Sequence, residues 1–159
     1  MQPRHSTDTD LIAQLEQHLL IPSPAAPPHP SLAAAANLLA GEPARAARFW
    51  THAGHQTTGP TVATHLAAAH TILHRDGWTQ GAYVTGGVCA KATLQIAAEE
   101  GNGTEHTAYV ARNCMNLLLR ARGEYRDIIA WNDTPGRRRE DLAELLTSAA
   151  SFATHYGPR

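Results

Sequence analysis

Two short segments, each joining a tryptophan to closely spaced turn residues beside a helix, constrain the fold more than any other part of the sequence. The first is HRDGWTQG at residues 74–81, and the second is DIIAWNDTPGRRREDLAELLTSAA at residues 127–150. Glycine, proline, asparagine and aspartate favour tight changes of chain direction, and a tryptophan beside them can close a small hydrophobic core. The sequence therefore predicts two defined corners of one small fold.

Composition indicates what kind of fold these corners belong to. The chain has 159 residues, which fits one domain with a modest core. Its residues are 43% hydrophobic but only 6% aromatic, and much of the apolar content is alanine, which favours helix and buries little area. We expect an all-α fold, a small helical bundle with one short β-hairpin or irregular loop near residues 81–88.

The N-terminal part is predicted to be an arm joined to the rest by a linker. Residues 1–21 form the arm, and a helix is expected over about residues 8–20. Its apolar face consists of Leu11, Ile12, Leu15 and Leu19, which recur at helical spacing. Residues 22–30 are rich in proline, which fixes the backbone and removes hydrogen-bond donors, so an extended linker is expected there.

The remaining chain is predicted to divide into a short helical region and a larger core. Residues 31–58 should form two short helices, over 31–41 and 42–54, which pack on the core or on a partner. Residues 59–156 should form the helical core domain. Its predicted helices cover about 60–76, 88–100 and 104–122, with a last helix after the PGR sequence; the first three end at glycines.

Several motifs of the core occur in a recognisable order. GWTQG is followed by a glycine-rich loop, a cysteine that opens an alanine-rich helix, and WND with PGR before the terminal helix. This order resembles an uncharacterised domain of unknown function found in actinobacterial and phage proteins, over roughly residues 62–153. In that domain cysteine often stands where this chain has Thr79, and threonine where it has Arg138. The resemblance implies fold boundaries and carries no activity.

The meeting point of GWTQG and WND is the candidate ligand site. Polar side chains beside an apolar cleft are typical of small-molecule pockets. The residues of this hypothesis are Trp78, Gln80, Trp131, Asn132 and Asp133. The alternative is structural, because tryptophan can cap a core and Asn and Asp can hold a turn through backbone hydrogen bonds.

Cys89 is the candidate nucleophile of a competing, thiol-dependent interpretation. A thiol at a helix N-terminus has its thiolate stabilised by the helix dipole. Gln80 upstream, with His106 and then Asn132 or Asp133 downstream, would follow the residue order of papain-like hydrolases. That architecture places the histidine on a sheet, however, and this sequence has almost no strand signal. The alternative is that Cys89 is a small core residue.

Histidines and arginines suggest two further sites. His70 and His74 lie one helical turn apart and could bind zinc, but they lack the glutamate of HExxH and a spaced third ligand. Solvated histidines beside a helical core stripe explain the same residues without a metal, and we expect no cofactor. The candidate anion or nucleic-acid patch consists of Arg120, Arg122, Arg126, Arg137, Arg138 and Arg139. Acidic residues at 140, 141 and 144 can instead neutralise these arginines across helical turns.

The overall charge and the cysteines narrow the functional classes. Formal net charge is −1, so binding to nucleic acid or an anionic membrane would have to be local. The two cysteines make no CxxC spacing, and the sequence shows no leader and no spanning segment, so a cytoplasmic protein is expected.

We expect a non-enzymatic binding or regulatory module, with a protein partner or self-association through the N-terminal arm. The competing functions are a thiol-dependent or metal-dependent enzyme and a local nucleic-acid binder.

Overall fold

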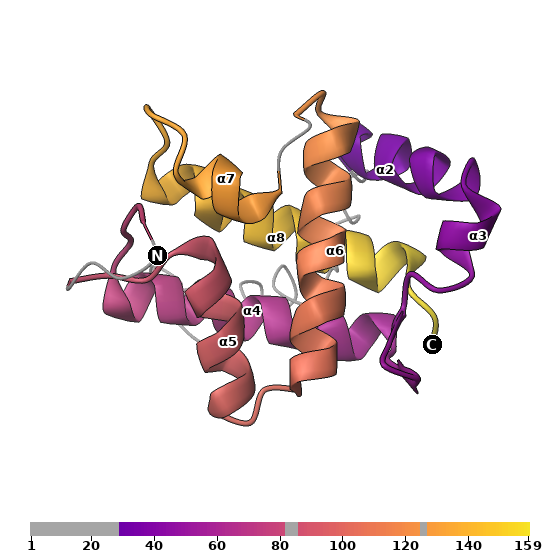
Figure 1. The fold of residues 1–159 in the computed structure, drawn as a ribbon, viewed down its shortest axis with the longest axis horizontal. Coiled ribbons are helices and arrows are strands. Elements are labelled where there is room, and N and C mark those ends of the chain that lie inside the picture. The colour runs from indigo at the N-terminus through magenta and orange to yellow at the C-terminus, as the bar shows by residue number, and fades with distance from the viewer. Residues whose placement is uncertain (1–28, 82–85, 125–126) are drawn as a thin grey trace, which may run out of the picture.

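Two long helices, α4 (Gly59–Asp76) and α8 (Arg139–Tyr156), pack antiparallel and form the base of the fold in the computed structural model (Figure 1). The structure describes residues 29–159 except 82–85 and 125–126. The start of α4 touches the end of α8 so closely that a Cβ on Gly59 would lie 2.2 Å from the carbonyl oxygen of Ala153. Glycine is therefore required where these two helices meet.

The other helices cover this pair. In Figure 1, α6 (Glu105–Ala121) crosses in front of α4 and α8, with α5 (Ala90–Glu99) on one side and α2 (Pro30–Ala40) on the other. The short α7 (Ile128–Asn132) contacts α5 and α6. The prediction of an all-α bundle is confirmed. The arm helix predicted over residues 8–20, and the linker up to residue 28, lie outside the described residues.

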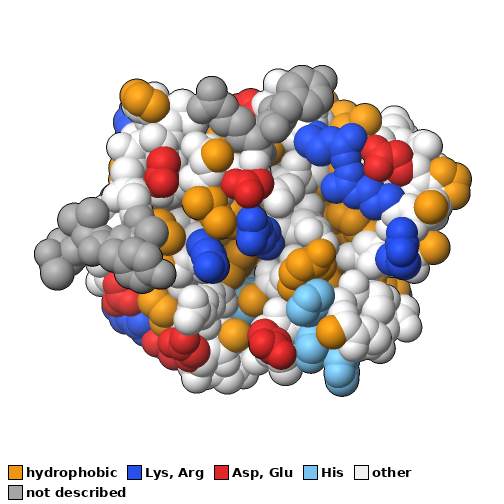
Figure 2. Space-filling model, viewed as in Figure 1, with side chains coloured by type: hydrophobic (Ala, Val, Ile, Leu, Met, Phe, Trp, Pro, Cys, Tyr) orange, Lys and Arg blue, Asp and Glu red, His pale blue; other side chains and the backbone are white. Residues whose placement is uncertain are grey.

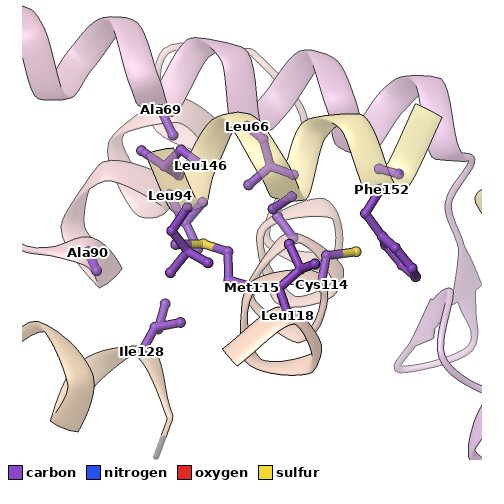
Figure 3. Close-up of a cluster of buried hydrophobic side chains, with 14 of the residues drawn as sticks. Leu66, Ala69, Ala90, Leu94, Cys114, Met115, Leu118, Ile128, Leu146 and Phe152 are labelled. Carbon is purple, nitrogen blue, oxygen red and sulfur yellow. The ribbon is translucent and has the colours of Figure 1, made fainter. Parts of the chain in front are cut away.

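The core lies between α4, α6 and α8 and is filled by the residues that recur at helical spacing. Leu66, Met115, Leu118 and Phe152 are completely enclosed, and Leu146 packs among them (Figure 3). Alanines of α4, α6 and α8 share this core and allow the helix axes to approach closely. An alanine-rich sequence thus builds its stability from close packing, with few aromatic side chains.

The prediction of a single helix over residues 42–54 was wrong. Its N-terminal part forms only α3 (Pro43–Ala46), and the chain then makes an antiparallel hairpin of β1 (Thr51–His52) and β2 (His55–Gln56). Ala53 and Gly54 both have positive φ, as a two-residue type I′ turn requires. The glycine that suggested a helix end therefore belongs to a β-turn.

Aromatic packing explains why the chain leaves the helix there. Phe49 is buried, and the Trp50 ring stacks on Phe152 of α8 at 6.3 Å between centroids. These contacts hold the segment before the hairpin against α8.

A hairpin or irregular loop was expected near residues 81–88. In the described residues, the two ends of this loop are joined by one isolated β-bridge, and no hairpin is formed. Trp78 and Val88 form a single parallel bridge, in which Val88 N–H donates to the Gly77 carbonyl at 2.9 Å. Residues 82–85 lie outside the described residues. Within the described ranges, every helix is too short or too polar to cross a membrane.

Candidate functional site

The corner between GWTQG and WND is built by residues that are about fifty positions apart. The Trp78 indole N–H donates to the side-chain carbonyl of Asn132 at 2.9 Å. The Gln80 side-chain amide donates to the backbone carbonyls of Asn132 at 3.0 Å and Thr134 at 2.8 Å. The two segments therefore meet, as the sequence suggested. Their role in ligand binding stays a prediction.

Asn132 is the centre of this corner. It is 1% exposed, and its side-chain oxygen accepts hydrogen bonds from Trp78 and from the backbone N–H of Ala90. Its side-chain nitrogen donates to the Thr79 carbonyl and to the Asp133 carboxylate. A buried amide with both ends satisfied stabilises a unique packing arrangement. Asn132 thus joins the loop after α4, the start of α5 and the end of α7.

Asp133 has its charge directed into the same corner. One carboxylate oxygen accepts from the Gly81 backbone N–H at 2.8 Å and from the Asn132 amide at 2.9 Å. These hydrogen bonds, chiefly that from Gly81, lower the pKa of Asp133. Because hydrogen bonding to the charged form favours ionisation, Asp133 is a poor proton donor and serves to fix the loop.

A small cavity of about 210 Å³ opens beside the corner. Typical small-molecule pockets have volumes of about 300–1,000 Å³, so this cavity would take at most a small group. Its walls come from the start of α5, from α7 and from the loop after α4. The lining residues are Gly81, Cys89, Ala90, Lys91, Ala92, Gln95, Ile129, Asn132 and Asp133.

Cys89 is the half-buried N-cap residue of α5, and it lines this cavity together with Asp133. His106 lies in a different cluster, where its ring stacks on His55 and its Nδ1 is 3.0 Å from Nδ1 of His52. The cysteine and the acid of the predicted catalytic set are brought to one cavity, whereas the histidine is placed at the β-hairpin. Gln80 is engaged by the two carbonyls described above.

The other thiol is enclosed in the core. Cys114 is completely buried in α6, and burial raises its pKa well above the ordinary value. A thiol that is difficult to ionise is a weak nucleophile. Cys114 therefore acts as a packing residue (Figure 3).

The histidine pair of α4 is adjacent in space. The rings of His70 and His74 are 4.5 Å apart between centroids. Burial, and secondarily the charge on His74, lowers the pKa of His70. Across residues 29–81, 86–124 and 127–159, the histidines, cysteines and acids form no group of three or more that could hold a metal ion. The pair therefore stands without a third ligand from the described chain.

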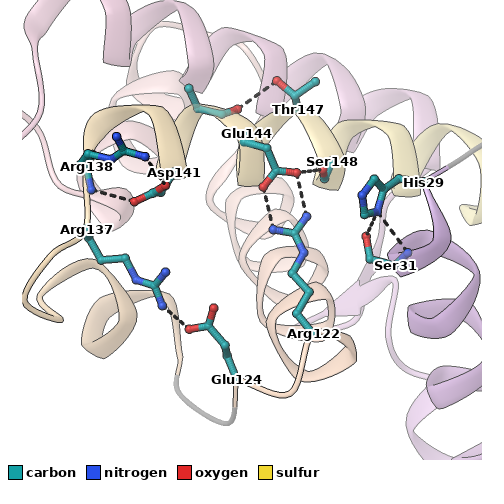
Figure 4. A network of polar contacts seen from close by, with 11 residues as sticks. His29, Ser31, Arg122, Glu124, Arg137, Arg138, Asp141, Glu144, Thr147 and Ser148 are labelled. Atoms are coloured by element: carbon teal, nitrogen blue, oxygen red, sulfur yellow. Dashed lines mark hydrogen bonds and ion pairs between the residues drawn. The ribbon is translucent and has the colours of Figure 1, made fainter.

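The arginines of the predicted anion patch face carboxylates. Arg122 forms two hydrogen bonds with Glu144, at 2.7 and 2.9 Å, which join α6 to α8 (Figure 4). Arg137 pairs with Glu124, and its guanidinium lies 4.6 Å from the centre of the buried Trp131 ring. The remaining described pairs are Arg120 with Glu42, Arg138 with Asp141 and Arg139 with Glu140. Arg126 lies outside the described residues.

These pairings decrease the positive potential that the sequence suggested. A phosphate would have to compete with a carboxylate at each of these arginines, and the bidentate Arg122–Glu144 pair already has the geometry that phosphate would use. Nucleic-acid binding at this patch stays a prediction.

His65 was not singled out by sequence reasoning. It is completely buried in α4, and its Nδ1 lies 2.6 Å from the carbonyl oxygen of Asn102 in the α5–α6 connection. Burial lowers its pKa, while hydrogen bonds to the backbone of Asn102 and Leu94 oppose this effect. The available signal was its position one turn from Val62 and Ala69 on the apolar face of the helix.

A larger groove lies between α5 and α6, on the face shown in Figure 2. Its volume is about 460 Å³. Basic side chains lie over the middle of this face and acidic ones toward the α5–α6 connection, with hydrophobic side chains between them. The groove is lined by His52, Lys91, Leu94, Gln95, Ala98, Glu99, Glu105, Ala108, Tyr109 and Arg112. Sequence reasoning missed it because it requires two helices to be placed side by side.

Comparison with known proteins places this fold in a family. Residues 57–152, more than half of the chain, match the family of unknown function DUF6197. The chain belongs to this family. The resemblance to a domain of unknown function, inferred from GWTQG and WND, is thereby confirmed. The matched region runs from just before α4 into α8 and contains the whole corner around Asn132. No curated protein and no solved structure matched the chain.

Proposed function

We propose that this domain is a non-enzymatic binding module that takes a protein helix into the groove between α5 and α6. The observation that carries the proposal is the groove itself, about 460 Å³ in volume and walled by Leu94, Ala98 and Ala108. Tyr109 stands at its edge with 45% of its surface exposed. An apolar groove between two helices is a common receptor for the apolar face of a third helix.

The polar corner favours a binding role over catalysis. The side chains of Trp78, Gln80, Asn132 and Asp133 donate to or accept from the chain's own groups. Catalytic groups need to reach a substrate within hydrogen-bond distance. Here these side chains hold the end of α7 to the start of α5, which keeps the neighbouring groove in shape.

The N-terminal arm of the chain itself is the first candidate for the helix that binds in this groove. The arm helix predicted over residues 8–20 has an apolar face of Leu11, Ile12, Leu15 and Leu19. A helix of this kind gains free energy by burying that face in a groove. We therefore propose self-association through the N-terminal arm, with a different protein helix as the alternative occupant.

Hydroxyl-radical labelling of the full chain tests the proposal with an internal reference. Tyr109 is 45% exposed at the groove, and Tyr156 is 40% exposed at the end of α8, so the free domain should label both to a similar extent. Under self-association, labelling of Tyr109 should decrease as the protein concentration rises, while that of Tyr156 stays constant. Equal labelling of the two tyrosines at all concentrations would refute self-association through this groove.

A further inference from the structure

A second hollow, the α3–α6 cleft, lies between α3, the β-hairpin and α6. Its volume is about 680 Å³, and small-molecule pockets usually have volumes of about 300–1,000 Å³. On this side of the molecule, basic side chains lie over α3, and histidines lie over the hairpin and the start of α6 (Figure 2). His52 and Tyr109 line both this cleft and the groove between α5 and α6, so the two hollows are neighbours.

Contacts at both ends of the segment from α3 to the hairpin hold the walls of the α3–α6 cleft in place. At one end, Glu42 accepts hydrogen bonds from Arg120 of α6 at 2.9 Å and from Arg45 of α3 at 3.3 Å. At the other end, the His52 ring stacks on Tyr109 of α6, with 3.9 Å between the ring centroids. The cleft is therefore framed by the protein's own contacts, and a preformed site lowers the entropic cost of binding a ligand.

The charge of the α3–α6 cleft is positive. Among the described residues that line it, Glu42 supplies the only carboxylate, and this carboxylate is shared by the guanidinium groups of Arg45 and Arg120. Arg48 also lines the cleft, donates to the Ala44 carbonyl at 3.4 Å, and pairs with no carboxylate in the described part of the chain. Guanidinium groups bind carboxylate and phosphate through two parallel hydrogen bonds. Arg48 is thus available to an anion.

Three further polar side chains that line the cleft make no hydrogen bond within the described ranges. They are the hydroxyl groups of Thr51 and Tyr109 and the amide of Asn113, and Thr51 and Asn113 are half-buried. Phe49, which is buried, adds an apolar surface to the same cleft. In the corner around Asn132, by contrast, the polar side chains bond to one another and to the backbone. Polar groups left unengaged beside an apolar surface are typical of a ligand site.

We propose that the α3–α6 cleft binds a small organic anion, whose carboxylate or phosphate group pairs with Arg48 and whose body lies against Phe49. Asn113 and Thr51 supply further hydrogen bonds and so select ligands with polar groups beside the anion. This site goes beyond the groove between α5 and α6, and it does not depend on what occupies that groove.

Three probes that carry the same aromatic ring test the proposal in the full chain. They are benzoate, phenyl phosphate and the uncharged benzamide. Each is titrated into isotopically labelled protein at constant ionic strength, and NMR follows the side-chain N–H signals of Arg48 and Asn113. We expect saturable shifts of these signals with at least one anion, and binding of benzamide that is about tenfold weaker. The relative affinity of the two anions identifies whether the site prefers carboxylate or phosphate.

Variants locate the anion. Arg48→Gln should weaken binding of the preferred anion about tenfold, because it removes the charge-assisted pair. Asn113→Ala should weaken it by a smaller factor. Neither side chain forms an ion pair or a side-chain hydrogen bond to another described helix, so both variants should fold. Arg139→Gln removes the same charge from α8, outside the cleft, and should leave the dissociation constant unchanged.

Three results would overturn the proposal. The first is benzamide binding as tightly as both anions, which would show that charge is not recognised. The second is the absence of saturable shifts at Arg48 and Asn113 with either anion. The third is an equal dissociation constant for Arg48→Gln and Arg139→Gln, which would place the anion outside this cleft. The proposed helix-binding groove would stand after any of these results.

Discussion

The Trp78 indole donates a 2.9 Å hydrogen bond to the side chain of Asn132, 54 positions further along the chain, and this bond closes the corner between α4, α5 and α7. The Asn132 amide also satisfies the Ala90 N–H at the start of α5 and the Thr79 carbonyl. Buried polar groups that lose a partner are costly. The corner is therefore a structural joint whose removal should be measurable.

Asn132→Ala should lower the free energy of unfolding by about 3 kcal/mol, because Trp78, Ala90 and Thr79 would each lose a buried partner. Urea unfolding followed by circular dichroism measures this change. Trp78→Phe keeps a ring and removes one donor, so it should cost less. Asn113→Ala, at a half-buried position of α6, is the matched control. A loss for Asn132→Ala no larger than for this control would show that the hydrogen bonds contribute nothing net.

Helical periodicity and local turn chemistry explain why much of this fold could be predicted. The apolar spacing in α4, α6 and α8 identified the faces that are buried, and glycines marked the ends of α4 and α6. The tryptophan segments identified a corner because turn residues and a large apolar ring occurred together. Each of these signals lies within one helix or one turn, so a short stretch of sequence is enough to specify the structure.

What could not be predicted depends on contacts between distant segments. The 42–54 segment has helix-favouring alanines, yet Trp50 stacks on Phe152 and the chain becomes a hairpin. Likewise, Glu144 was expected to pair with an arginine near the start of its own helix, but it pairs with Arg122, which caps the end of α6. In the first case tertiary packing overrode helix propensity, and the packing partner lies about a hundred residues away. In the second case an ion pair between two helices replaced the pairing that was expected within one helix.

His65 should make the stability of the protein depend on pH in the mildly acidic range. Burial lowers its pKa in the folded state below the value of about 6.5 expected when unfolded. The unfolded chain therefore binds more protons below that pH, so stability is complete above about pH 6.5 and decreases as the pH falls below it. Unfolding free energies between about pH 7.5 and 5 measure this decrease.

The matching variant is His65→Leu, which should flatten the pH dependence in this window whatever its effect on absolute stability. His70, whose pKa is also lowered but which is only partly buried, provides the comparison. His70→Gln should retain most of the slope. If wild type and His65→Leu show the same slope, His65 does not control the pH dependence.

The two thiols should differ in accessibility in the native protein. Cys89 is half-buried at the small cavity, whereas Cys114 is completely buried and has a raised pKa. Iodoacetamide should therefore modify Cys89 in the folded protein and reach Cys114 only after unfolding. Peptide mass spectrometry resolves the two sites. Cys89→Ser should remove the native reaction, and comparable rates at both sites would contradict the buried position of Cys114.

Arg122 and Glu144 should form the most strongly coupled of the ion pairs between long helices. Their two hydrogen bonds join α6 to α8, and the Arg122 side chain is only 23% exposed. A double-mutant cycle with Arg122→Met and Glu144→Gln should give a coupling energy of about 1 kcal/mol, which decreases at high salt. The exposed Arg139–Glu140 pair, 3.4 Å apart, should give almost none.

Because Glu144 occupies the guanidinium of Arg122, Glu144→Gln should also increase salt-sensitive retention on nucleic acid if the arginine patch can bind phosphate. Unchanged retention would leave Arg122 with a structural role alone.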